Sequence, residues 1–139
     1  MQFPANFTAS KVNLEALEEF LHYASNDRCR IAMEFRDKSC FLKPMPQILH
    51  RYHAALVISH SSRYPVPDCR QTGDFLYYRF HGPGKMFASS YTERALFRWA
   101  REMESFLAKK RDVYAFFNND SGGYAPQNAK SLAEKIVSS

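Results

Sequence analysis

The chain has 139 residues, of which 45% are hydrophobic, 15% aromatic and 24% charged. This composition is typical of one folded domain and excludes an intrinsically disordered chain. The formal net charge of +5 favours anionic partners in general. No apolar stretch approaches the roughly 20 residues that cross a bilayer, so no membrane partner is expected.

The cysteines and the first ten residues together indicate a cytoplasmic protein. Cys29, Cys40 and Cys69 are odd in number and widely spaced, and they match neither a zinc pattern nor a disulfide framework. Residues 1–10 lack the basic and apolar regions of a secretory signal. We therefore expect reduced thiols and a cytoplasmic location.

The first half of the chain is expected to alternate strands with helices. Short apolar runs are typical of strands covered on both faces, whereas apolar residues at a spacing of three to four indicate helices. In chain order, we expect the stub of a strand at residues 1–4, a helix at 13–24, a strand at 31–35, a short helix at 46–53 and a strand at 54–59.

The second half repeats the alternation after a long irregular connection. The stretch from Ser59 to Phe75 contains two prolines and no helical period, and long loops of this kind are often functional. Ser90 and Glu93 have the spacing of a capping box, so we expect a helix to begin there. The expected elements are strands at residues 75–80 and 113–117, and helices at 90–110 and from Pro126 onward.

Side-chain alternation along the strands predicts a barrel-like sheet rather than a flat one. In residues 75–81, Leu76, Tyr78 and Phe80 share one face, and Arg79 and His81 share the other. Helices on both sides of a flat sheet would bury the polar face, whereas the interior of a barrel opens to solvent at one end. We therefore expect a parallel α/β fold, as a TIM-barrel-like (β/α) structure of four to five strands.

Polar side chains at the carboxyl ends of the strands form the predicted site, because parallel α/β folds place ligands there. Glu34 and His81 are the candidate catalytic residues, as a general base and a general acid or base. Cationic side chains among the others would hold a phosphate or a carboxylate. The candidate ligand-binding residues are Arg36, His60, Arg79, Lys85, Asn118 and Asn119.

Two explanations of these residues stay open. A Glu34–Arg79 ion pair that joins neighbouring strands would account for both residues without catalysis, because a buried arginine needs a carboxylate. Similarly, Asn119 and Asp120 are the residue types that end a strand and cap a helix. Whether the protein is an enzyme is therefore left open by its sequence.

Metal and cofactor sites are not expected. His50 and His53 lie three residues apart on an expected helix, but no HExxH pattern accompanies them. No GxSxG motif and no Walker or Rossmann glycine pattern is present. We therefore predict neither a metal site nor a cofactor.

Six segments together resemble domain-of-unknown-function family 72, the YecE-like proteins. They are MQFPANF, AMEFRDKSCF, YYRFHGP, YTERALFRWA, VYAFFNND and APQNAKSLAEKI, in that order along nearly the whole chain. The chain departs from the family at Asp37, where histidine is usual, and near His60, where an acidic residue is usual. The resemblance implies a (β/α) barrel of about 250 residues, of which residues 1–139 would form a single domain, the C-terminal half.

Two functions from different classes follow from the residues and the resemblance. One is a barrel enzyme that acts on an anionic ligand containing a phosphate or a nucleotide; nucleic acid is included among these partners. The other is a non-catalytic fragment or binding module that assembles with another chain. Because a partial barrel leaves two unpaired strand edges, we expect a homodimer or a complementing chain as partner.

Overall fold

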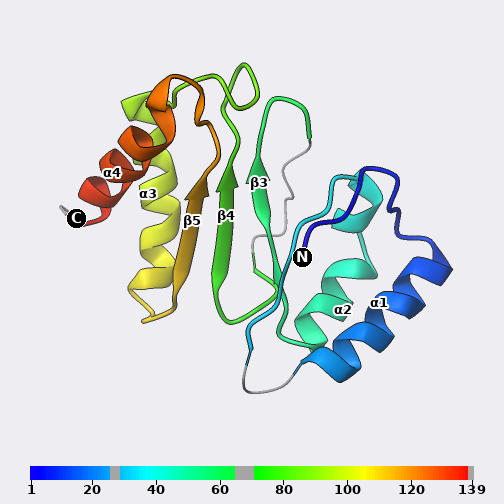
Figure 1. Cartoon of the computed structure of the whole chain (residues 1–139). Coiled ribbons are helices and arrows are strands. Elements are labelled where there is room, and N and C mark those ends of the chain that lie inside the picture. The colour runs from blue at the N-terminus through cyan, green and yellow to red at the C-terminus, as the bar shows by residue number, and fades with distance from the viewer. Residues whose placement is uncertain (26–28, 65–70, 138–139) are drawn as a thin grey trace. The chain divides into compact units, whose positions relative to one another are not determined.

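The computed structural model describes residues 1–25, 29–64 and 71–137, and it shows an α/β structure with parallel strands (Figure 1). Helices and strands alternate along most of the chain, as the sequence predicts. In chain order the elements are α1 (Lys11–Ala24), β1 (Ala32–Met33), the 3₁₀ helix η1 (Lys38–Phe41), α2 (Met45–Arg51), β2 (Ala55–Leu56), β3 (Ile58–His60), β4 (Leu76–Phe80), α3 (Glu93–Leu107), β5 (Val113–Phe117), the 3₁₀ helix η2 (Ser121–Gly123) and α4 (Tyr124–Val137).

The strands form two sheets, ordered β1-β2 and β3-β4-β5. In the first sheet Ala32 is the parallel partner of Ala55. Gln2 bridges to Glu34 in parallel, which confirms the predicted strand stub at the N-terminal end. The predicted strand at residues 54–59 is instead two short strands, one in each sheet, separated by Val57.

Packing divides the chain into two compact units. The first comprises Met1–Ile58 and Pro65–Tyr77, and the second comprises Ser59–Tyr64 and Tyr78–Ser139. The single domain expected from the sequence stays a prediction. Each unit is described by itself below.

In the first unit, α1 and α2 pack against the side of β1 that carries Met33. Met33 and Phe35 are buried there together with Leu21 and Leu49, as side-chain alternation predicts. The Phe35 ring stacks on the ring of Phe3, with centroids 4.8 Å apart. The chain before α1 therefore contributes to the core of this unit. Of the cysteines, Cys40 is buried in this core, Cys29 is exposed, and Cys69 lies outside the described residues.

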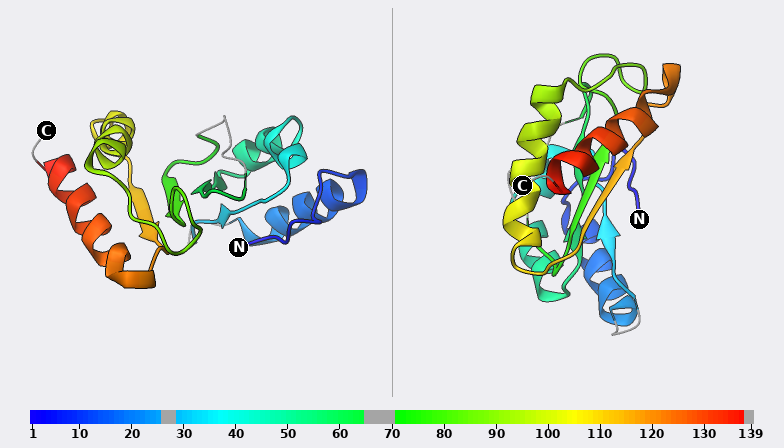
Figure 2. Two further views of the ribbon diagram at one scale, coloured as in Figure 1. Left: turned by 90° about the horizontal axis from the view of Figure 1, so that it is seen from above. Right: turned by 90° about the vertical axis from the view of Figure 1, so that its left-hand side faces the viewer.

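The second unit places α3 and α4 side by side next to β5 (Figures 1 and 2). Tyr78 and Phe80 of β4 are buried, and both rings meet Trp99 of α3 edge-on at 5.7 and 5.3 Å. Phe117 of β5 stacks on Phe80 with centroids 4.6 Å apart. An aromatic layer between the strands and α3 is therefore the core of this unit.

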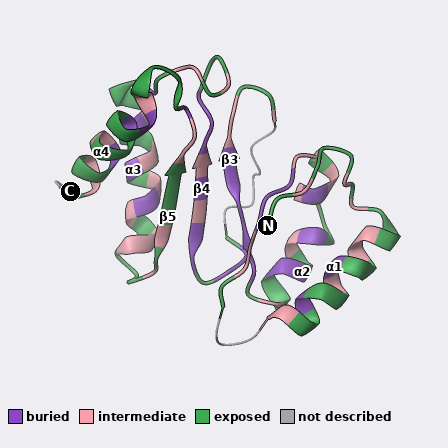
Figure 3. Cartoon of the chain, viewed as in Figure 1, coloured by how far each residue is buried: buried purple, intermediate pink, exposed green. Residues whose placement is uncertain are grey.

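Two predictions about the second unit are wrong. The cap of α3 is Thr92, whose hydroxyl accepts the Ala95 N–H at 3.2 Å, and not Ser90 in a capping box. Strand β5 was predicted to be buried, but Tyr114 and Phe116 are 40% and 46% exposed (Figure 3). The reason is that β5 is the last strand in the order β3-β4-β5, and among the described residues only β4 pairs with it.

Thr72 closes the free edge of β2 with its side chain. The Ala55 N–H donates to the carbonyl of Ile31, the residue just before β1. The N–H of the next residue, Leu56, therefore points to the opposite edge of β2. There the Thr72 hydroxyl accepts the Leu56 N–H and donates to the Ala54 carbonyl, both at 2.7 Å. Gly73 follows, and a Cβ on it would lie 2.7 Å from the His53 carbonyl oxygen, so only glycine fits this approach.

We predict that Thr72→Val lowers the free energy of unfolding by about 1–3 kcal/mol, because a buried N–H and a buried carbonyl lose their partner. Thr72→Ser keeps the hydroxyl and is the matched control, expected to lose less. Urea denaturation followed by circular dichroism measures both variants. A loss in Thr72→Val that is smaller than the loss in Thr72→Ser would contradict the role assigned to the hydroxyl.

Candidate functional site

Arg79 and Asn118 meet at the carboxyl ends of β4 and β5. The Asn118 N–H donates to the Phe80 carbonyl at 2.8 Å, which continues the pairing of the two strands beyond β5. The Asn118 side-chain oxygen accepts hydrogen bonds from Arg79 Nε at 3.2 Å and from Arg79 Nη2 at 3.0 Å. Both contacts fix the plane of the guanidinium group.

The Arg79–Asn118 pair lies on the sheet face that points away from α3. Tyr78 and Phe80 of β4 contact Trp99 of α3, so Arg79 between them points to the other face. Along β5 the same parity holds, because Phe117 packs with Phe80 and the next residue, Asn118, turns away. The guanidinium group of β4 and the amide that follows β5 therefore lie on the same face of the sheet.

His81 follows β4 directly and is held by its backbone. It is 3% exposed, its N–H donates to the His60 carbonyl at 2.9 Å, and its carbonyl accepts the Phe87 N–H at 2.6 Å. The imidazole meets the Phe87 ring edge-on, with centroids 5.4 Å apart. The loop after β4 thus folds back onto the histidine that the sequence predicts as catalytic.

His60 lies on the α3 side of the sheet, the face opposite to Arg79. Its ring packs against Trp99 at 5.3 Å, and its Nδ1 lies 2.9 Å from the Tyr91 hydroxyl oxygen. That hydroxyl also accepts the Gly82 N–H at 3.1 Å, and burial raises the pKa of Tyr91 above its usual value. The structure therefore does not bring the His60 side chain together with Arg79.

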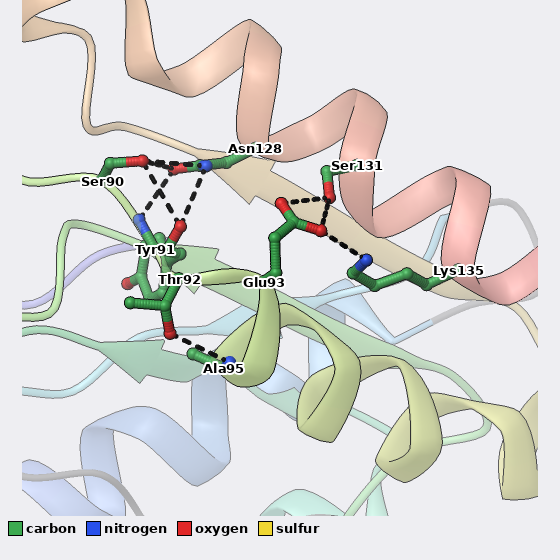
Figure 4. A network of polar contacts seen from close by, with 8 residues as sticks. All are labelled: Ser90, Tyr91, Thr92, Glu93, Ala95, Asn128, Ser131 and Lys135. Carbon is green, nitrogen blue, oxygen red and sulfur yellow. Dashed lines mark hydrogen bonds and ion pairs between the residues drawn. The ribbon is translucent and has the colours of Figure 1, made fainter.

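Asn119 is fully buried and ties β5 to the start of α3. Its Nδ2 donates to the Ser89 carbonyl at 2.9 Å and to the Asn128 side-chain oxygen at 2.8 Å. Asn128, on α4, also accepts the Tyr91 N–H at 3.1 Å and contacts the Ser90 hydroxyl (Figure 4). Sequence reasoning missed Asn128; its only signal was a polar residue on the apolar stripe of the last helix.

Three further predicted site residues remain, two in the first unit and one in the second. Glu34 is 2% exposed in the first unit, directly after β1, and its carbonyl accepts the Phe3 N–H at 2.9 Å. Arg36 is half-buried two residues further along the chain. Lys85 is exposed in the loop after β4 of the second unit. Glu34 has Met33 and Phe35 on either side facing the helices, so it points away from α1 and α2.

Metal ligands do not cluster in the described part of the chain. Within residues 1–25, 29–64 and 71–137, no three histidine, cysteine, aspartate or glutamate side chains gather as a metal site requires.

Over the same ranges, no helix combines the length and the apolar character of a membrane span.

Comparisons with known proteins agree on one family. The model of a family described as a protein of unknown function, DUF72, matches residues 1–139. The UPF0759 protein YunF of Bacillus subtilis is 27% identical, over 97% of this chain and 56% of its own. A DUF72 family protein of Enterococcus faecalis has a TM-score of 0.85 at 24% identity, over 98% of this chain and 57% of that chain.

A second solved structure shows the same fold. A DUF72 family protein of Thermotoga maritima has a TM-score of 0.69 at 23% identity, over 99% of this chain and 56% of that chain. The chain therefore spans little more than half the length of these relatives.

We predict that Asn128→Ala destabilises the second unit by about 1–3 kcal/mol, because the Tyr91 N–H and the Asn119 amide lose a buried acceptor. Gln127→Ala is the comparison, since it removes an exposed amide one position earlier on α4. Urea denaturation of both variants gives the two losses. Equal losses in the two variants would contradict the role assigned to the Asn128 oxygen.

A second prediction concerns Glu93, which joins α3 to α4 (Figure 4). Hydrogen bonds from Lys135 at 2.6 Å and from Ser131 hold the pKa of Glu93 below its usual value. The folded state therefore favours the charged carboxylate, and its stabilisation is lost as the pH falls through the lowered pKa.

The wild type should be more stable than Glu93→Gln near pH 6. The difference between their free energies of unfolding should shrink as the pH is lowered from about 6 to about 3. The urea midpoints of both proteins across that pH range measure this difference. Glu15→Gln, at an exposed position on α1, is the matched control. A difference that stays constant with pH would contradict the assignment.

Proposed function

The chain belongs to the DUF72 family, and we propose that it is part of a (β/α) barrel that binds an anionic ligand at the carboxyl ends of its strands. Parallel strands in sequential order, with helices in the connections, support the barrel. In such folds ligands bind beyond the carboxyl ends of the strands. The expected ligand carries a phosphate, as a nucleotide or a nucleic acid does.

The Arg79–Asn118 pair is the observation that carries this proposal. Asn118 accepts two hydrogen bonds from Arg79 and so fixes the guanidinium plane. The amide oxygen carries no net charge, so its role in this contact is to orient the guanidinium group. Arginine held in this way suits the two-point recognition of phosphate or carboxylate oxygens.

His81 adds a titratable side chain at the end of the same strand. It directly follows Phe80, the last residue of β4, and is therefore two residues beyond Arg79 along the chain. An imidazole in that place suits proton transfer to or from a bound ligand. The catalytic roles of His81 and Glu34, and the ligand contacts of Arg36, His60, Lys85 and Asn119, stay predictions, as does the cytoplasmic location.

Inorganic phosphate and adenosine monophosphate are suitable probes, titrated into ¹⁵N-labelled protein and followed by NMR. We predict shifts at the residues that end β4 and β5. Arg79→Gln should weaken binding about tenfold or more, as expected when a charged hydrogen-bonding partner is lost. Asn118→Ala should weaken it less, because the cation remains but loses its orientation.

Lys109→Gln is the matched control, since it removes one positive charge at the exposed end of α3. It should leave both affinities unchanged. If Lys109→Gln and Arg79→Gln weakened binding equally, the effect would be one of net charge, and the site would be wrong.

The second candidate function is a binding module that assembles with another chain. The carrying observation is β5, which ends the order β3-β4-β5 and exposes Tyr114 and Phe116. An apolar edge strand with unused N–H and carbonyl groups pairs readily with a further strand. The relatives contain more than 40% of their length beyond the matched part, which is enough chain to cover such an edge in them.

We therefore predict that the 139-residue chain is a homodimer or larger in solution. Static light scattering after size exclusion should give a mass of at least twice 16.1 kDa. Tyr114→Lys with Phe116→Lys should shift the protein to the monomer, because two cations oppose burial of that face. The double change Phe97→Lys and Val12→Lys, at exposed positions on α3 and α1, should not. A monodisperse wild-type monomer would overturn the prediction.

A further inference from the structure

A hollow of about 410 Å³ opens on the α3 side of the second unit, away from the Arg79–Asn118 pair. Its lining comes from one stripe of α3, from the segment just before that helix, from the end of β3 and from the loop after β4. The residues are His60, Pro83, Tyr91, Ala95, Arg98, Trp99 and Glu102. Of its residues, His60 alone belongs to the site expected from the sequence.

The walls of the hollow are suited to a flat ring. His60, Tyr91 and Trp99 are all aromatic, and the His60 ring meets the other two at centroid distances of 5.5 and 5.3 Å. Hydrogen bonding of Tyr91 to His60 and to the Gly82 N–H holds two of these rings in place. Preformed aromatic walls bind planar groups with little loss of side-chain entropy.

The polar groups of the hollow are suited to one acidic group. Arg98 is exposed and places a guanidinium among the aromatic walls. Glu102, one turn further along α3, accepts a hydrogen bond from the Tyr78 hydroxyl at 3.0 Å and adds a negative charge to the same surface. One cation beside one anion favours a singly charged ligand over a multiply charged one.

The volume agrees with that class of ligand. A dry cavity of roughly 150 Å³ is enough to bind benzene. The 410 Å³ of this hollow therefore holds a ring together with an acidic side arm, and it lies within the usual size range of ligand sites.

We propose that this hollow is a second binding site, for a planar aromatic compound with a single carboxylate. The ring lies among His60, Tyr91 and Trp99, and the carboxylate pairs with Arg98. The site is separate from the one proposed at the strand ends, since the two lie on opposite faces of the sheet.

Benzoate tests the proposal, with Trp99 as the reporter because it is the only tryptophan of the chain. Benzoate should change the tryptophan fluorescence saturably. Benzyl alcohol, which lacks the charge, and acetate, which lacks the ring, should each bind more weakly. Absence of a saturable response to benzoate at tens of millimolar would overturn the proposal, as would equal responses to benzoate and acetate.

Variants then locate the bound molecule. Arg98→Gln should weaken benzoate binding about threefold or more, because a charge-assisted hydrogen bond is lost. Arg94→Gln is the matched control one turn earlier on α3, and Arg79→Gln tests the other face; neither should change the affinity. Equal weakening by Arg94→Gln, or weakening by Arg79→Gln, would overturn the assignment.

Chemical shifts keep the test independent of Trp99. In ¹⁵N-labelled wild-type protein, benzoate should shift the Tyr91 and Ala95 amides and the Trp99 indole N–H. Shifts confined to the ends of β4 and β5 would overturn the proposal and would instead place the carboxylate at Arg79.

Discussion

The alternation of side chains along β4 is the constraint on which both candidate sites depend. Burying Tyr78 and Phe80 against Trp99 forces Arg79 to the opposite face, because a strand has only two faces. The aromatic side of the strand forms a core with Trp99, and Trp99 in turn lines the hollow at α3. The other side carries the half-buried Arg79, which Asn118 orients. A shift of pairing by one residue would bury Arg79 and expose two large rings, so the register is strongly specified.

The end of β5 shows how three consecutive polar residues acquire different roles. Asn118 continues the strand by one hydrogen bond and points to the face of Arg79. Asn119 points the other way and is buried in contacts with α4 and the start of α3. Asp120 precedes η2 and is exposed, with no side-chain capping bond in the described structure. Asn118 therefore orients Arg79 and Asn119 holds helices to the strand, although their side chains are chemically identical.

Most of the elements could be predicted from the sequence, because apolar runs and helical spacing report directly on burial. The exposure of β5 is not visible in its apolar run, which looks the same in a central strand and in an edge strand. It is expected only from the unpaired edge that a partial barrel leaves at its last strand. The wrong cap of α3 has a local cause: Ser90 and Thr92 are both good caps, and only the contacts of Asn128 decide between them.

Alternation alone could place Arg79 on the face of β4 opposite to the buried rings, whereas it left open which of Asn118 and Asn119 shares that face. The face on which the His60 side chain lies was harder to predict. His60 is the last residue of a three-residue strand, which has too few alternating neighbours to fix that face. Asn128 was out of reach, since its partners are 9 and 37 residues away along the chain.

Closure of the β2 edge by Thr72 has a consequence for how this part of the fold can vary. A neighbouring strand would need several residues in register, whereas Thr72 satisfies two backbone groups with one hydroxyl. Thr72 and the close approach of Gly73 hold the chain where it returns to the sheet. At this edge the sequence therefore needs one hydroxyl followed by one glycine, a requirement of two adjacent positions in place of the run of alternating residues that a paired strand would need.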